Sequence, residues 1–162
     1  YEHPDDVLAR QKTQNAATMS GLAFGNAQVG LAHSMGHALG ATFHMPHGLS
    51  VAVSNLYVIP FSGRDAGDRY RDIAHAVGFA EKSPKEATAR LVTATKDLMK
   101  RLGMPLCLRD AGISQGMLQQ NIEALVEKTN RSTCTFVNPR VPDVEEIRKL
   151  FVCMYDATEV NF

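Results

Sequence analysis

Apolar residues recur at steps of three and four along most of the chain, the spacing of helices that bury one face. We expect Pro46 to stop one helix and open the next, because proline lacks an amide hydrogen but suits the first helical position. The following helix should then end near Pro60. The first half is thus predicted to contain helices over residues 4–28, 31–43 and 46–60, and a shorter amphipathic helix with Tyr70, Ile73, Ala74 and Val77 on one face.

Capping signals mark the helices of the second half. Ser83 stands three residues before Glu86, the arrangement of a capping box, and the helix that follows should end at Gly103. Ser114 is expected to open a helix that ends near residue 128, and Asp143 to open the last one. No alternating strand pattern bounded by a hairpin turn occurs. The sequence therefore predicts an all-α fold, a helical bundle that forms a single domain over residues 1–162.

The first predicted helix has one face of small and apolar side chains. Small residues on this face allow two backbones to approach closely. The closely spaced glycines in and after this helix are expected to serve tight helix packing, although open space beside a bound metal would need the same residues. The face comprises Ala16, Met19, Ala23 and Ala27, and the glycines are Gly21, Gly25, Gly36 and Gly40.

Charge and composition exclude several classes of partner. The 17 basic and 17 acidic residues cancel, and no basic stripe that could neutralise phosphates occurs, so nucleic acid is not expected. No apolar run reaches the roughly 18 residues of a membrane span. Cys107, Cys134 and Cys153 are odd in number and far apart, which indicates free thiols of a reducing compartment, and the cytoplasm is the expected location.

Four of the six histidines lie within fifteen residues, at His33, His37, His44 and His47. His33 and His37 are four residues apart, which places both imidazoles on one face of a helix, at a spacing that two ligands of one metal ion can use. Pro46 turns the chain so that His47 can return toward His33. A catalytic metal site is therefore one interpretation of the cluster. Histidines that are merely packed or exposed are the other.

The motifs around these histidines resemble those of the iron-containing alcohol dehydrogenases. The resemblance covers the whole chain and is most specific between residues 21 and 61. It implies the C-terminal helical domain of a dehydroquinate synthase-like enzyme, whose N-terminal nucleotide-binding α/β domain is absent from this chain. The matching segments are Gly21–Asn26, Gly30–Gly40 and Pro46–Gly48, with Asn138, Pro139 and Arg140 ahead of the final helix.

The resemblance also implies roles for individual residues. His33 and His47 correspond to two metal ligands, and His37 to a histidine beside the metal with a part in proton transfer. Phe24 is a candidate for lining the nicotinamide or substrate cleft, with a core position as the alternative, and His44 is expected to be exposed or to neighbour the ligands. The family's two other ligands, an aspartate and a histidine four residues later, lie upstream of the matching region. No Asp-x-x-x-His and no glycine-rich dinucleotide loop occurs here.

The implied function is half of an NAD(P)-dependent oxidoreductase that interconverts alcohols and aldehydes or ketones. Ferrous iron is the implied metal and zinc a second candidate, with NAD or NADP as the cofactor of the intact enzyme. The expected partners are a small alcohol or aldehyde, the absent N-terminal domain and further copies of the intact enzyme in a homo-oligomer. The chain alone should be inactive. A glycerol dehydrogenase or dehydroquinate synthase type of enzyme is an alternative, although Leu49 and Ser50 after His47-Gly48 favour the alcohol dehydrogenase branch. A non-catalytic helical module that binds metal or protein is another.

Overall fold

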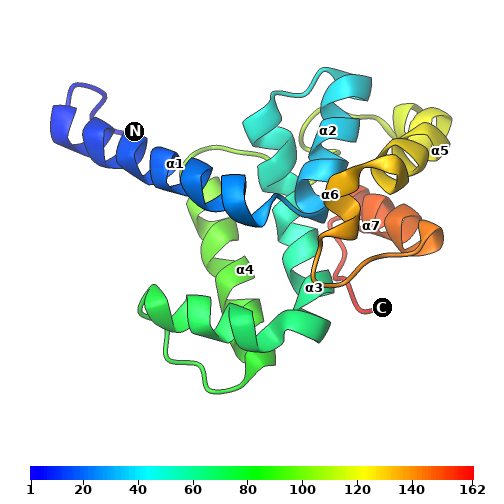
Figure 1. Cartoon of the computed structure of the whole chain (residues 1–162). Coiled ribbons are helices and arrows are strands. Elements are labelled where there is room, and N and C mark those ends of the chain that lie inside the picture. Colours follow the sequence, from blue (N-terminus) through cyan, green and yellow to red (C-terminus); the bar gives the residue numbers. More distant parts are fainter.

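The computed structural model describes all 162 residues and contains seven helices and no strand (Figure 1). The predicted all-α fold is confirmed, and the short α6 is the one helix that the sequence pattern did not predict. The helices are α1 (Val7–Ala27), α2 (Leu31–Phe43), α3 (His47–Ala76), α4 (Pro84–Arg101), α5 (Gln115–Arg131), α6 (Thr133–Phe136) and α7 (Val144–Asp156).

The core lies between α2, α3, α5 and α7. The long α3 packs against α2, α4 and α7, while α2 also packs against α5 and α6. The fully buried side chains come from α2, α3, α5 and α7 and from the segment after α4. The largest of them are Phe61, Phe151, Leu31, Met35, Leu39, Leu56 and Leu108.

The predicted capping residues begin the helices at which they were placed. The Ser83 hydroxyl accepts the Glu86 amide N–H at 3.2 Å at the start of α4. At the start of α5, the Ser114 hydroxyl accepts a backbone N–H of the first helical turn in the same way. At the start of α7, Asp143 and Glu146 each accept the other's backbone N–H, at 2.8 and 3.0 Å, a complete capping box. These contacts are local, which is why the sequence pattern identifies them.

The predicted end of the third helix near Pro60 is wrong. Helix α3 continues through Pro60 to Ala76 and is interrupted only at Ala66, where φ is −118° and ψ is 22°. The segment predicted as a separate helix is therefore the last part of α3, and Ile73 on its predicted apolar face is half exposed. A proline inside a helix costs about 3 kcal/mol. Burial of Tyr57 and Phe61 on either side of Pro60 offsets that cost, since each large side chain contributes about 1.5–3 kcal/mol.

The expectation that the two glycines of α1 serve tight helix packing is also wrong. Helix α1 has no buried residue and contacts no other helix. A methyl group added at Gly21 or Gly25 would meet nothing within 4 Å. In Figure 1, α1 is the blue arm that extends away from the other helices. Its small apolar face therefore lies open.

Close packing does occur where α2 crosses α3. A Cβ added at Gly36 would lie 2.7 Å from Val51 Cγ2 and 3.2 Å from Val51 Cα, so glycine is the residue that permits this approach. A Cβ at Gly40 would lie 3.3 Å from the Met45 carbonyl oxygen, where the chain turns from α2 into α3. The predicted packing role of these two glycines is confirmed.

A distant asparagine caps the start of α2. The N-cap residue, Gly30, has no side chain to cap with, and the Asn138 side-chain oxygen accepts the Leu31 N–H at 3.1 Å instead. The Asn138 amide donates to Ser62 Oγ at 2.9 Å and to the Arg140 carbonyl at 2.7 Å. One buried side chain thus joins α2, α3 and the loop before α7.

Replacing Gly36 with alanine is expected to lower the free energy of unfolding by about 1–3 kcal/mol, because the added methyl must push Val51 and its backbone away. Urea unfolding followed by circular dichroism measures this. Gly116→Ala is the matched control, since a Cβ at that helical position meets nothing within 4 Å. That control should be neutral or slightly stabilising. Equal stability of the two variants would contradict the close crossing of α2 and α3.

Replacing Asn138 with alanine is expected to lower the free energy of unfolding by about 2–3 kcal/mol, because it removes the cap of α2 and leaves buried polar groups unpaired. The same urea titration measures the loss. Asn121→Ala serves as the control, since the Asn121 amide donates only to Met117 of its own helix. A change at Asn138 no larger than that at Asn121 would argue against the capping role.

Candidate metal centre

Three imidazoles converge where α2 passes the start of α3. The ring centroids of His33 and His37 are 5.8 Å apart, those of His33 and His47 are 5.5 Å apart, and those of His37 and His47 are 5.2 Å apart. His33 and His37 share one face of α2, and His47 is the first residue of α3. The turn at Pro46 therefore returns His47 to His33, as the sequence predicts.

The cluster lies at the surface, with His33 its most enclosed member. His33 is half-buried, while His37 and His47 are exposed. Burial lowers the pKa of His33 below its usual value, and the neighbouring His47 and His37 lower it further. The neutral imidazole, which is the form that binds a metal, is thereby favoured at His33.

The donor set fits part of a metal site. Imidazole nitrogens bind zinc and ferrous iron, at about 2.0–2.1 Å for zinc, and two rings 5.5 Å apart can reach one ion with small side-chain rotations. The chain does not hold three or more His, Cys, Asp or Glu side chains placed to bind one ion. These residues therefore fit two positions of a coordination shell and leave the others to groups outside this cluster.

Phe24 and His44 occupy different surroundings. The Phe24 ring, near the end of α1, lies 6.5 Å from the His33 ring, and about half of its surface is exposed. The alternative that Phe24 is a core residue is therefore wrong. His44 is exposed and ends α2 with a left-handed φ of 56°. It belongs to no ring pair with the other three histidines.

The backbone beneath the cluster is held by residues to which the sequence pattern assigned no role. The Ser50 hydroxyl donates to the His47 carbonyl at 2.9 Å and fixes the first turn of α3. Asn138 fixes the first turn of α2 by accepting the N–H of Leu31, two residues before His33. The Asn-Pro-Arg match included Asn138, but only the folded chain shows which amide it caps.

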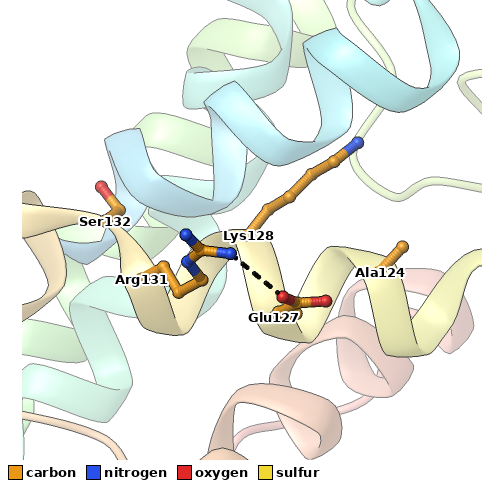
Figure 2. Close-up of a pocket in the computed structure, with 5 residues that line it drawn as sticks. All are labelled: Ala124, Glu127, Lys128, Arg131 and Ser132. Carbon is orange, nitrogen blue, oxygen red and sulfur yellow. Dashed lines mark hydrogen bonds and ion pairs between the residues drawn. The ribbon is translucent and has the colours of Figure 1, made fainter.

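One surface cavity lies away from the histidine cluster. It is an open depression over the last turns of α5, and no candidate residue lines it (Figure 2). Glu127 and Arg131 form an exposed ion pair there, and Lys128 extends to the Thr42 hydroxyl of α2. The histidine cluster therefore does not open into this depression.

Two further expectations concern the thiols and the membrane. All three cysteines are free; Cys107 is buried, and Cys134 and Cys153 are partly buried. No helix combines the length and the hydrophobicity that crossing a membrane requires.

Comparison with known proteins identifies the family. The family model "Fe-containing alcohol dehydrogenase family, C-terminal" matches residues 1–155. The chain is 35% identical over 157 residues to the NADPH-dependent butanol dehydrogenase of Clostridium saccharobutylicum, covering 97% of this chain and 40% of that protein. The alcohol dehydrogenase of Oenococcus oeni superposes with a TM-score of 0.85 at 28% identity, covering 93% of this chain and 39% of that one.

The iron-containing alcohol dehydrogenase of Thermococcus thioreducens superposes with a TM-score of 0.80 at 33% identity, covering 93% of this chain and 38% of that one. The chain thus spans about two-fifths of the length of these relatives. The helical content, the structural superposition and the residues matched by the family model all indicate the same family. The chain belongs to the Fe-containing alcohol dehydrogenase family and corresponds to its C-terminal helical domain.

Proposed function

We propose that this chain is the metal-binding half of an NAD(P)-dependent oxidoreductase that interconverts alcohols and aldehydes or ketones, and that it is inactive alone. The observation that carries the proposal is the convergence of His33, His37 and His47 from two helices. The relatives support the reaction class, since they include a butanol dehydrogenase and a lactaldehyde reductase. Oxidation of an alcohol to an aldehyde requires a hydride acceptor, and NAD or NADP fills that role.

Within this proposal, His33 and His47 hold the metal, and His37 exchanges a proton at the substrate oxygen. The exposed ring of His37 lies 5.2 Å from that of His47, so substrate at the metal would be within its reach. The bound metal supplies a Lewis acid for the substrate oxygen. Phe24 borders the same space beside His33 and presents an apolar ring to the nicotinamide or the substrate.

The remaining parts of the enzyme are proposed to come from a segment that, in the relatives, precedes the region matched by this chain. That segment would supply the nucleotide pocket and an aspartate and a histidine for the metal. Three imidazoles and one carboxylate suit ferrous iron and also zinc, which nitrogen ligands generally bind more tightly. We propose iron as the native metal because of the family to which the chain belongs.

His33→Ala and His47→Ala are each expected to weaken binding of Zn²⁺ to the chain at least about tenfold, because each removes one of the two proposed ligands. Isothermal titration calorimetry with the metal alone measures the affinity. His44→Asn is the control, since His44 is exposed, lies outside the cluster and has a left-handed φ that asparagine tolerates. Unchanged affinity in either alanine variant would remove that histidine from the proposed site.

The chain supplied with ferrous iron, NADPH and butyraldehyde is expected to show no turnover by NADPH absorbance, because it lacks a hydride-carrier pocket and a full set of ligands. A fusion in which the portion of the butanol dehydrogenase upstream of the matched region precedes Tyr1 is expected to reduce the aldehyde. His33→Ala should abolish that activity, and His44→Asn should not. Robust turnover by the chain alone would contradict the division into two parts.

A further inference from the structure

The three rings of the histidine cluster have nearly the spacing of imidazoles that share one ion. In a tetrahedral zinc site the Zn–N distance is about 2.0–2.1 Å and each ring centre lies about 1 Å beyond its nitrogen, so the centres of two bound rings are about 5 Å apart. The ring centres of His33, His37 and His47 are between 5.2 and 5.8 Å apart. His37 therefore lies about as close to the other two rings as a third ligand would.

Ring orientation is what separates this cluster from a three-ligand site. As the side chains are oriented, no three of them could hold one ion. The rings of His37 and His47 are stacked with an interplanar angle of 29°, and the in-plane lone pairs of nearly parallel rings do not meet at one point. The His33 ring is inclined by 82° to that of His37 and by 53° to that of His47. One of the two stacked rings must therefore turn before three nitrogens can converge.

Such a turn requires little movement. Rotation about the Cβ–Cγ bond of a histidine redirects both ring nitrogens and leaves the ring centre almost in place, because the axis of that bond passes close to the centre. The energy of this torsion varies broadly, without narrow wells. His37 and His47 are exposed, so a turning ring displaces water and not packed side chains. The close crossing at Gly36 meanwhile keeps the two helices fixed.

The elements that carry the histidines offer no other strong ligand. From Thr13 to Gly63 the chain contains no Asp, Glu or Cys. The same stretch has no Lys or Arg, so no cation on these helices opposes a bound divalent ion. An ion at the cluster would thus meet imidazole nitrogens and water. Zinc accepts this combination in proteins, with three histidines and one water in a tetrahedral arrangement.

We propose that the chain alone binds one Zn²⁺ ion through His33, His37 and His47, with water in the fourth position. The proposal rests on the proposed function, because it uses the same two ligands, and it adds His37 as the third. In the assembled enzyme, the aspartate and the histidine of the preceding segment complete the four positions, and His37 is released for proton exchange. The three-histidine site binds zinc more weakly than the completed one, since it is open to water and contains no carboxylate.

Isothermal titration calorimetry of the 162-residue chain with Zn²⁺ tests the third ligand. The chain is expected to bind one ion, and His37→Ala to weaken binding at least about tenfold, because it removes one of three ligands. The variant should fold, since His37 is exposed and alanine favours helix. His44→Asn is the control, because His44 is exposed and belongs to no ring pair with the cluster. Equal affinity in the two variants overturns the proposal, and so does the absence of one-to-one binding in the wild-type chain.

Nitrogen-15 NMR of the histidine side chains distinguishes a ligand from a neighbour that only stabilises the site. Addition of Zn²⁺ should shift one ring nitrogen of each of His33, His37 and His47 to the resonance range of a metal-bound nitrogen. The other three histidines of the chain should keep their shifts. A spectrum in which only His33 and His47 have metal-bound nitrogens overturns the proposal, even if His37→Ala weakens binding.

These measurements separate the two proposals. A fusion that reduces no aldehyde, combined with zinc binding by three histidines in the chain alone, overturns the proposed function and leaves the three-histidine site standing. An active fusion, combined with an affinity of the chain alone that does not depend on His37, leaves the proposed function standing and overturns the three-histidine site.

Discussion

The close crossing of α2 and α3 at Gly36 determines the geometry of the histidine cluster. With no side chain at Gly36, Val51 of α3 packs directly onto the backbone of α2. His33 and His37 lie on α2 on either side of this crossing in sequence, and His47 begins α3 one turn before Val51. Because both helices are rigid over such short distances, the crossing and the turn at Pro46 together bring three imidazoles within 5.2 to 5.8 Å of one another. The site is thus a consequence of helix packing.

That crossing is held in place from the other end of the chain. Asn138 caps α2 and bonds to Ser62 of α3. Arg140, two residues later, stacks its guanidinium over Phe61 at 3.9 Å and pairs with Glu146 of α7. The loop before α7 therefore fixes α2 relative to α3, although it lies more than ninety positions from the last of the three clustered histidines. Each of these polar contacts is at least partly buried, which makes its geometry specific.

The sequence predicted what local rules control. Ser83, Ser114 and Asp143 begin helices because a hydroxyl or carboxylate three residues before a free amide stabilises a helix start in any context. The rule that proline ends a helix failed at Pro60, because the burial of Tyr57 and Phe61 outweighs the cost of a proline inside α3. Asn138 could not be assigned, because a hydrogen bond across 107 positions leaves no periodic pattern in the sequence. The convergence of His33 with His47 was predictable from the proline turn, whereas their roles came from family resemblance and remain proposals.

The error at α1 has a different cause. A face of small and apolar side chains permits close packing but does not specify a neighbouring helix, and within this chain α1 contacts none. In the proposed enzyme the remaining metal ligands come from a different part of the polypeptide, so assembly of the two parts and metal binding become one thermodynamic process. The ion would bind tightly only when both parts are assembled, and its binding would stabilise the assembled state by RT ln(1 + [M]/Kd). In the proposed enzyme, two imidazoles on a preformed helix crossing constitute half of a site whose completion and assembly depend on each other.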